Sequence, residues 1–119
     1  MFAEEYQRKF KNAEALLGEK FMQVATTVHF DWLAIIMFYG AVHLAERKFA
    51  LWKKPHHSKG HSERNNLVRK LKNGSSIVGD LLLLYNASLD ARYENINLTY
   101  EDILVLKESY EKIKNILID

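Results

Sequence analysis

The first part of the chain repeats an apolar residue every three or four positions. This spacing places the apolar side chains on one stripe of a helix, with charged residues around it. The stripe consists of Phe2, Tyr6, Phe10, Ala13 and Leu17. Gly18 follows directly, and because glycine commonly ends helices, the pattern predicts a first helix that stops there.

A longer apolar pattern predicts a second helix from near Asp31 to about Lys53. Asp31 can cap its start, and the helix should end before Pro55, because a residue that precedes proline is disfavoured in the α region. We predict a buried face made of Trp32, Ile35, Ile36, Tyr39, Val42 and His43. Gly40 either lets another part of the chain approach closely or is a tolerated helical glycine, which costs about 1 kcal/mol.

The sequence of residues 62–85 predicts a helix that is interrupted in the middle. Ser62 is a suitable cap for a helix carrying Leu67, Val68 and Leu71. Asn73 and Gly74 should break or bend it, and Ser75 or Ser76 can restart it. The apolar face of the second part consists of Ile77, Val78, Leu81, Leu82 and Tyr85.

The last region has the most regular amphipathic pattern in the chain. After a polar connector at 95–98, Thr99 and Asp102 resemble a capping box, with the shorter Asp in place of Glu. Apolar residues then follow at spacings of three, four, three and four: Ile103, Leu106, Tyr110, Ile113 and Leu117. The pattern predicts a helix that packs along one face, or alternatively a seam for a second chain.

No stretch alternates polar and apolar residues in the way that half-buried strands do, and the connections are short. The predicted fold is therefore all-α, an up-and-down bundle of four or five helices in one domain that covers residues 1–119. Hydrophobic residues make up 48% of the chain and charged residues 27%, which is typical of globular proteins.

Composition also excludes several classes of protein. The chain has no Cys, which excludes a disulfide framework and thiolate chemistry. Its longest apolar run, residues 32–42, is too short to span a bilayer, which requires about 20 residues. Charged residues interrupt residues 1–20 throughout, so no signal peptide is predicted. We expect a soluble, cytoplasmic protein without a membrane partner.

Charge is distributed unevenly. Residues 47–72 contain nine Lys or Arg and one acid, Glu63, a local charge of +8 in a chain whose formal net charge is +2. The remainder therefore carries −6. Such clustering predicts a basic surface that can meet a polyanion, and Lys53, Lys54 and Lys59 are its candidate contacts.

Three histidines, His56, His57 and His61, lie close enough in sequence for two or three of them to share a metal ion. The chain has no HExxH motif, no Cys and no carboxylate near these residues except Glu63. We therefore predict no metal site and no cofactor. A flexible His-rich loop that binds no metal is the simpler interpretation.

Four further residues are candidates for chemistry. His43 is either a satisfied core histidine or a neutral base, because nearby Arg side chains disfavour its charged form. His61, Arg64 and Asn65 are either a solvated first turn or a phosphate site, because helix N-termini attract anions.

Arg92 and Tyr93 form another pair with two interpretations. Arg could pair with a phosphate while Tyr stacks on a base. Alternatively, Tyr93 packs into the end of the bundle while Arg92 pairs with Asp90 or Glu94. The chain has neither of the common glycine-rich phosphate loops, so a phosphate would have to bind through side chains such as these.

Together, the segments FYGAVHLAERKFA, HSKGHSERNNLV and LYNASLDARY resemble small stand-alone prokaryotic and archaeal members of the HEPN superfamily. The resemblance covers about Trp32 to Tyr93. Tyr39 and His43 match its FYxAxH helix. The loop-helix motif is matched by His61, Arg64 and Asn65, and the ARY segment by Arg92 and Tyr93.

The resemblance implies a four- or five-helix bundle that is usually homodimeric. It also implies a link to RNA cleavage, nucleotide binding, or toxin-antitoxin and defence systems, with a nucleotidyltransferase or an antitoxin protein as a possible partner. The chain departs from the pattern in one respect. Active HEPN ribonucleases typically carry an Arg that is followed, after four to six residues, by a His, and this chain has no Arg followed by a His at that spacing.

Three functions remain open from the sequence. The first is an RNA- or nucleotide-binding helical protein. The second is a metal-independent ribonuclease, with His61 or His43 as general base and Arg64 or Arg92 stabilising the phosphorane charge. The third is a non-catalytic interaction module, so the sequence leaves open whether the protein is an enzyme.

Overall fold

The computed structural model describes residues 3–17, 27–94 and 98–118, and within these ranges it contains helices and no strands. The elements are α1 (Ala3–Leu16), α3 (Thr27–Ala50), α4 (His61–Arg69), η1 (Gly74–Ile77), α5 (Val78–Leu89), η2 (Asp90–Glu94) and α6 (Tyr100–Leu117). Five are α-helices, whereas η1 is a 3₁₀ turn and η2 a π-helical turn. The predicted all-α fold is therefore confirmed.

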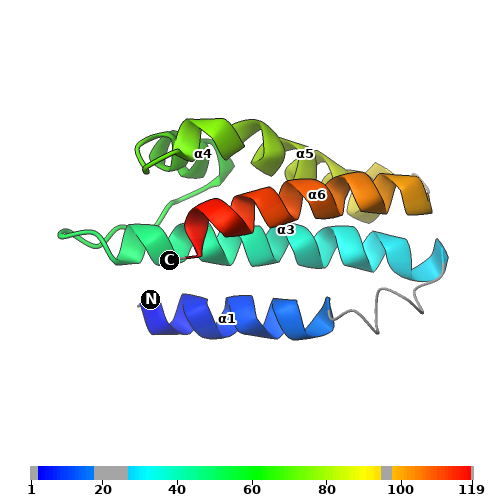
Figure 1. Cartoon of the computed structure of the whole chain (residues 1–119), viewed down its shortest axis with the longest axis horizontal. Coiled ribbons are helices and arrows are strands. Elements are labelled where there is room, and N and C mark those ends of the chain that lie inside the picture. Colours follow the sequence, from blue (N-terminus) through cyan, green and yellow to red (C-terminus); the bar gives the residue numbers. More distant parts are fainter. Residues whose placement is uncertain (1–2, 18–26, 95–97, 119) are drawn as a thin grey trace.

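The long helix α3 lies at the centre of the molecule (Figure 1). It packs against α1 on one side and against α5 and α6 on the other. Its buried residues therefore surround most of its circumference, as in helices that are hydrophobic all round. They are Phe30, Leu33, Ala34, Met37, Phe38, Gly40, Ala41, Val42, Leu44, Ala45, Glu46 and Phe49.

This central position makes the predicted buried face of α3 largely wrong. Trp32 is 61% exposed and Tyr39 is 40% exposed. Ile35, Ile36 and His43 are half-buried, and of the predicted residues only Val42 is fully buried. The apolar pattern could not distinguish faces, because nearly every turn of α3 carries apolar residues in several directions.

The predicted start of α3 is wrong, whereas the predicted end before Pro55 is confirmed. The helix begins at Thr27, so Asp31 lies inside it and does not cap it. It ends at Ala50, before Lys53, because the backbone N–H of His56 turns back to donate to the carbonyl of Phe49 at 3.1 Å. For the first helix, Tyr6, Phe10 and Ala13 are buried as predicted. Phe2 and Gly18 lie outside the described residues.

The break predicted at Asn73 and Gly74 is confirmed. Asn73 adopts a left-handed backbone with φ 62°, and a Cβ at Gly74 would lie 1.7 Å from the carbonyl oxygen of Val68, so only glycine fits there. The start of α4 differs from the prediction, because Gly60 occupies the cap position and Ser62 lies inside the first turn.

The start of α5 also differs from the prediction. Ser75 and Ser76 lie in η1, where the Ser76 hydroxyl donates to the Asn73 carbonyl at 2.6 Å, and the α-helix begins only at Val78. The buried face of this region contains Ile77, Leu81 and Leu84. Leu82, which we placed on that face, is 44% exposed.

The predictions for α6 are confirmed in detail. The Thr99 backbone N–H donates to Asp102 at 2.9 Å, and the Asp102 N–H donates back to the Thr99 hydroxyl at 3.2 Å. All five predicted apolar residues are buried. Tyr110 and Ala13 also explain Gly40, where an added Cβ would lie 3.0 Å from the Tyr110 hydroxyl and 3.4 Å from the Ala13 Cβ. None of the described helices combines the length and the apolar character that a membrane crossing requires.

Candidate functional site

Tyr39, His43 and Glu46 form a stripe along one face of α3, because steps of four and three residues return to the same side of a helix. We call these three residues the polar stripe. Side chains from other elements meet it at several points: Tyr6 from α1, Arg64 from α4 and Arg92 from η2. Of these residues, Glu46 has no role among the candidates predicted from the sequence, and Tyr6 is predicted only as a core residue.

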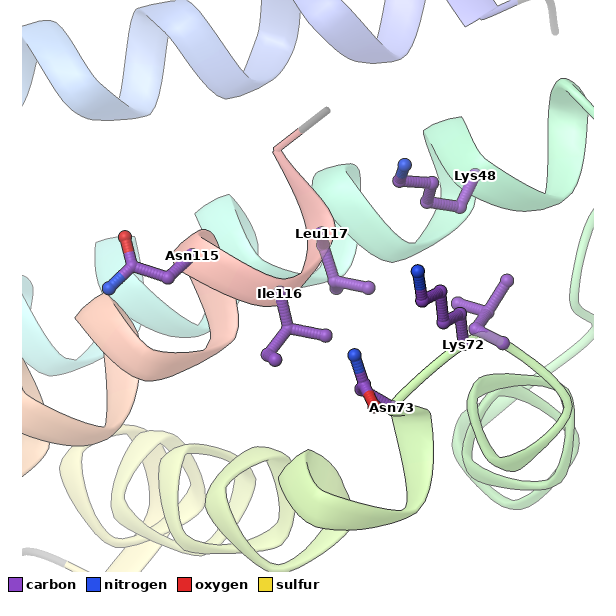
Figure 2. A pocket seen from close by; sticks show the side chains of 7 residues that line it. Lys48, Lys72, Asn73, Asn115, Ile116 and Leu117 are labelled. Carbon is purple, nitrogen blue, oxygen red and sulfur yellow. The ribbon is translucent and has the colours of Figure 1, made fainter.

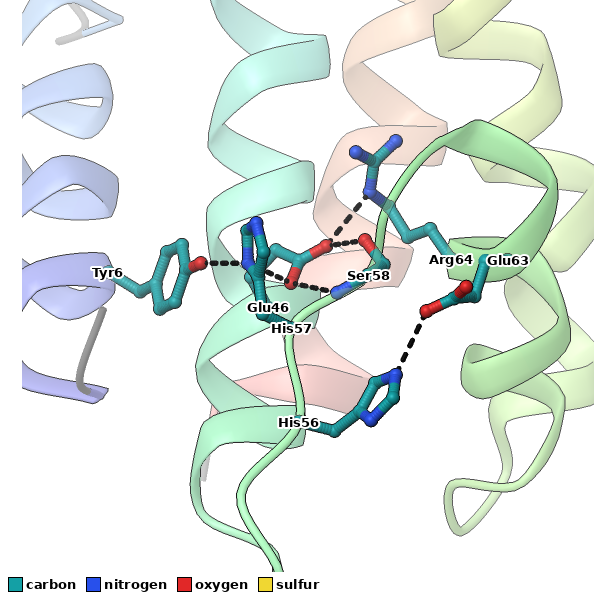
Figure 3. A network of polar contacts seen from close by, with 7 residues as sticks. All are labelled: Tyr6, Glu46, His56, His57, Ser58, Glu63 and Arg64. Carbon is teal, nitrogen blue, oxygen red and sulfur yellow. Dashed lines mark hydrogen bonds and ion pairs between the residues drawn. The ribbon is translucent and has the colours of Figure 1, made fainter.

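Glu46 is the centre of a buried network (Figure 3). It is 2% exposed, and its carboxylate accepts hydrogen bonds from the backbone N–H of Ser58 at 3.2 Å, from the Ser58 hydroxyl, and from the Nε–H of Arg64 at 3.3 Å. His57 Nδ1 lies 3.2 Å from Oε2, the carboxylate oxygen that also accepts from the Ser58 N–H. A buried carboxylate needs such partners because its desolvation is costly. The network therefore fastens the loop before α4 to the C-terminal end of α3.

Tyr6 adds a contact from the other side of the same network. Its hydroxyl forms a hydrogen bond with His57 Nδ1, and the two rings are stacked with centroids 5.9 Å apart. Burial, together with the charges of Glu46 and Glu5, raises the pKa of Tyr6. Its hydroxyl therefore stays protonated, and α1 and the loop are held against the same end of α3.

The three histidines of this region, His56, His57 and His61, have separate partners. His56 pairs with Glu63 at 2.9 Å, and this hydrogen bond lowers the pKa of Glu63. His57 contacts Tyr6 and Glu46, whereas the ring of His61 stacks on Tyr85 at 3.7 Å. Across the described ranges, no three His or acidic side chains converge as metal ligands would.

The residues at the start of α4 divide between two places. His61 stays with Asn65, whose side-chain nitrogen lies 3.4 Å from His61 Nε2, and burial and Arg64 lower the pKa of the His61 ring. Arg64 turns inward to Glu46. A phosphate at the start of α4 would therefore contact the side chains of His61 and Asn65 first, because the Arg64 Nε–H is directed toward Glu46.

His43 is half-buried between two tyrosines, with ring centroids 6.3 Å from Tyr6 and 6.5 Å from Tyr39. Within the described part of the chain, its Nδ1 atom is buried and has no hydrogen-bond partner. Burial and then Lys9 lower the pKa of the ring, and Arg64 adds to this while Glu46 opposes it. His43 is thus neutral near pH 7, as the chemical interpretation required, and its Nδ1 does not have the partner expected of a satisfied core histidine.

Arg92 reaches the polar stripe from η2. Its Nη1 donates to the Tyr39 hydroxyl at 2.9 Å, and its guanidinium carbon lies 5.7 Å from the centroid of that ring. Its Nε donates to the carbonyl of Ser88 at 3.3 Å. These contacts hold a cation at the exposed edge of Tyr39. The side chain of Tyr93 lies outside the described residues.

The basic segment surrounds one end of the molecule but does not form a single flat surface. Lys53, Lys54 and Lys59 are exposed in and beside the loop after α3. Lys48 and Lys72 instead line a hollow of about 320 Å³ near the end of α6, together with Asn73 and Asn115 (Figure 2). The positive charge is therefore divided between this loop and the hollow, with Arg64 directed inward to Glu46.

Sequence reasoning missed the centre of the site. Glu46 lies three positions after His43 on the same face of the helix, so its register with Tyr39 and His43 was a usable signal. The sequence contains no comparable signal for Ser58, because Ser58 reaches Glu46 only when the loop folds over it.

Comparison with known proteins adds no family, since no protein-family model, curated protein or solved structure matches the chain. The structure establishes a small all-helical globular protein. The function must therefore be argued from the polar stripe and the charges around it.

Proposed function

We propose that this protein is a HEPN-like helical bundle that binds RNA or nucleotides. The observation that carries the proposal is the contact between Arg92 and Tyr39, which places a guanidinium at the edge of an exposed aromatic ring in line with His43. A guanidinium matches the geometry of phosphate oxygens, and an aromatic ring offers a face to a base. Both groups that a nucleotide requires are thus present side by side.

The tautomer of His43 favours binding. A buried N–H without an acceptor is rare in proteins, and Nδ1 is buried with no hydrogen-bond partner among the described residues. The neutral ring therefore carries its proton on Nε2. His43 then offers a hydrogen-bond donor, which a phosphate oxygen or a base can accept.

The family resemblance receives support from the same contact. Arg92 of the ARY segment and Tyr39 of the FYxAxH helix are 53 positions apart in sequence, yet their side chains are hydrogen-bonded. Motif residues of a functional site are expected to gather in this way. His61 and Asn65 contact each other at the start of α4, where the third motif lies.

We extend the proposal to partners. A homodimer agrees with the resemblance, as does a nucleotidyltransferase or antitoxin partner in a toxin-antitoxin or defence system. Exposed apolar residues on neighbouring helices α5 and α6 would serve such an interface, and they are Leu82, Leu83, Leu104 and Val105. Light scattering should then give twice the 13.9 kDa chain mass. A monomer at all concentrations would contradict this extension and leave RNA binding untouched.

Salt dependence tests the binding proposal. Binding of a labelled single-stranded RNA, followed by fluorescence anisotropy, should weaken about tenfold or more between 50 and 200 mM salt if about three phosphates are contacted. Charge reversal at exposed Lys53 and Lys54 should weaken it further. RNA that stays unbound at 50 mM salt, or binding that salt does not change, would contradict the proposal. Arg64→Ala is a poor first probe, because Arg64 also pairs with buried Glu46.

A metal-independent ribonuclease is the second candidate, favoured by the neutral His43 ring near Arg64. In such a reaction the base removes the proton of a ribose 2′-hydroxyl, whose oxygen attacks the adjacent phosphorus and displaces the 5′-oxygen. The Nε2–H tautomer is a donor, so this reaction would first require the ring proton to move to Nδ1. Incubation of labelled RNA in chelator with the parent and with His43→Ala distinguishes the two functions. RNA that stays intact with both proteins excludes the nuclease and leaves the binding proposal. Cleavage by the parent but not by His43→Ala establishes the nuclease.

A further inference from the structure

Helix α3 exposes two large aromatic side chains in register with the polar stripe. Trp32 is 61% exposed and Tyr39 is 40% exposed. They are seven residues apart, so they point within about 20° of each other around the helix axis. A tryptophan is seldom so exposed, and large exposed aromatic groups commonly mark binding surfaces.

The surroundings of these rings identify the kind of ligand. Arg92 stands at the edge of Tyr39, and His43 follows one turn later on the same face. A protein helix packed onto this stripe would bury these polar groups without supplying regular partners for them. A nucleic-acid strand supplies both a base for each ring and a phosphate for the guanidinium.

The distance between the Trp32 and Tyr39 rings indicates whether the RNA ligand is single-stranded or double-stranded. Seven residues at a rise of about 1.5 Å place Trp32 and Tyr39 about 10 Å apart along the helix. Successive bases in a duplex are stacked about 3.4 Å apart and present their faces only to each other. Bases can reach both rings only if the strand is unpaired and its bases are splayed outward.

Resting on the proposed function, we infer that α3 is a stacking platform for single-stranded RNA. One base stacks on Trp32, a second base stacks on Tyr39, and Arg92 pairs with a phosphate beside the second base. The Nε2–H of His43 lies next along the path of the strand. Duplex RNA of the same sequence is excluded from both rings.

Tryptophan fluorescence gives a direct test, because the chain has only two Trp residues. Trp52 packs against Phe49, with ring centroids 5.3 Å apart, so Trp52→Phe is a mild change that leaves Trp32 as the single emitter. Single-stranded RNA should quench this emission with the same midpoint as the anisotropy titration. The matched duplex should require at least tenfold higher concentration.

A pair of variants supplies the second test. Trp32→Leu should weaken single-strand binding about tenfold, a typical effect of losing one base-aromatic stack. Tyr100→Leu is the matched control, because Tyr100 is 54% exposed but lies on α6. The Tyr100→Leu variant should bind single-stranded RNA with the same affinity as the parent protein. Circular dichroism of both variants checks that the fold is retained.

The outcomes separate this inference from the function on which it rests. If neither the parent protein nor any variant binds RNA at low salt, the proposed function is wrong. If RNA binds with the expected salt dependence but Trp32 is not quenched and Trp32→Leu binds normally, the stacking platform is wrong and the proposed function stands. Equal affinity for the single strand and the duplex would also overturn the inference.

Discussion

Arg64 and Glu46 join α4 to α3 through an ion pair in which the Arg64 Nε lies 3.3 Å from the Glu46 carboxylate. Glu46 is 2% exposed and the Arg64 side chain 17% exposed, so the pair is largely shielded from water. Arg64 is thus part of what holds the loop and α4 in place. Any effect of Arg64 on RNA binding must be separated from this structural role.

We predict that Arg64→Ala destabilises the protein by about 2 kcal/mol, because a buried carboxylate loses one of its charged partners. Ser58 and His57 remain as partners of Glu46 and keep the loss below that of an unpaired buried charge. Urea unfolding followed by circular dichroism measures the change.

A double-mutant cycle supplies the control for this prediction. Glu46→Gln combined with Arg64→Ala should be less destabilising than the sum of the two single changes, because the second change no longer strands a charge. Strict additivity of the two would show that the ion pair contributes nothing and would contradict the account of the network.

Stability should fall as the pH is lowered from about 7 toward 5. Burial, Lys9 and Arg64 hold the pKa of the His43 ring below its ordinary value of 6.5, against the opposing charge of Glu46. His61 shifts in the same direction. The unfolded chain therefore binds protons more readily in this range, so the stability present above pH 6.5 is lost as the pH falls through the folded-state pKa values.

Two measurements check the pH prediction. NMR titration of the His43 ring should give a midpoint below 6.5, and His43→Gln should reduce the loss of urea stability between pH 7 and pH 5. A His43 midpoint at or above 6.5, or a variant with an unchanged pH profile, would mean that the ring is more exposed or better paired than described.

Two glycine substitutions should have opposite effects. Gly40→Ala gains up to about 1 kcal/mol of helix propensity, but its Cβ would meet the Tyr110 hydroxyl at 3.0 Å and ring carbon at 3.2 Å. Tyr110 is buried and its hydroxyl donates to Glu14 at 2.6 Å, so it cannot move freely. Overpacking of this kind costs about 1 to 3 kcal/mol, and we expect a net loss of about 1 kcal/mol.

Gly79→Ala is the matched control on α5, where nothing lies within 4 Å of an added Cβ. It should stabilise the protein by about 0.5 kcal/mol. Thermal or urea unfolding of both variants gives the comparison. A stabilising Gly40→Ala would show that α1, α3 and α6 pack less closely at this point than the structure describes.

Local sequence signals predicted the parts of the fold that depend on local chemistry. The capping box at Thr99 and Asp102 and the break at Asn73 and Gly74 involve only groups that lie within a few residues of each other in sequence, and both are confirmed. The buried face of α3 depends on which helices surround it. No local pattern contains that information, which is why Trp32 was misplaced.

The candidate site likewise contains residues that local sequence motifs predicted and residues whose role depends on the tertiary fold. Motif residues identified Tyr39, His43 and Arg92, and the structure brings Arg92 onto Tyr39 and His43 next to it. Glu46 was missed because an acid within a helix is normally solvated, and its burial follows only from the loop that folds Ser58 over it. That loop path is a tertiary property, which residue spacing could not provide.

One comparison tests the central claim, that RNA binds where Arg92 meets Tyr39. Arg92→Ala and Arg69→Ala each remove one positive charge, but Arg69 is exposed on α4 and contacts Asn66. We predict that Arg92→Ala weakens the affinity for single-stranded RNA about tenfold more than Arg69→Ala does, because of these two residues only Arg92 stands beside Tyr39, where it can donate a charge-assisted hydrogen bond to an RNA phosphate. Equal losses in the two variants would show that RNA responds only to overall charge and would contradict the proposed site.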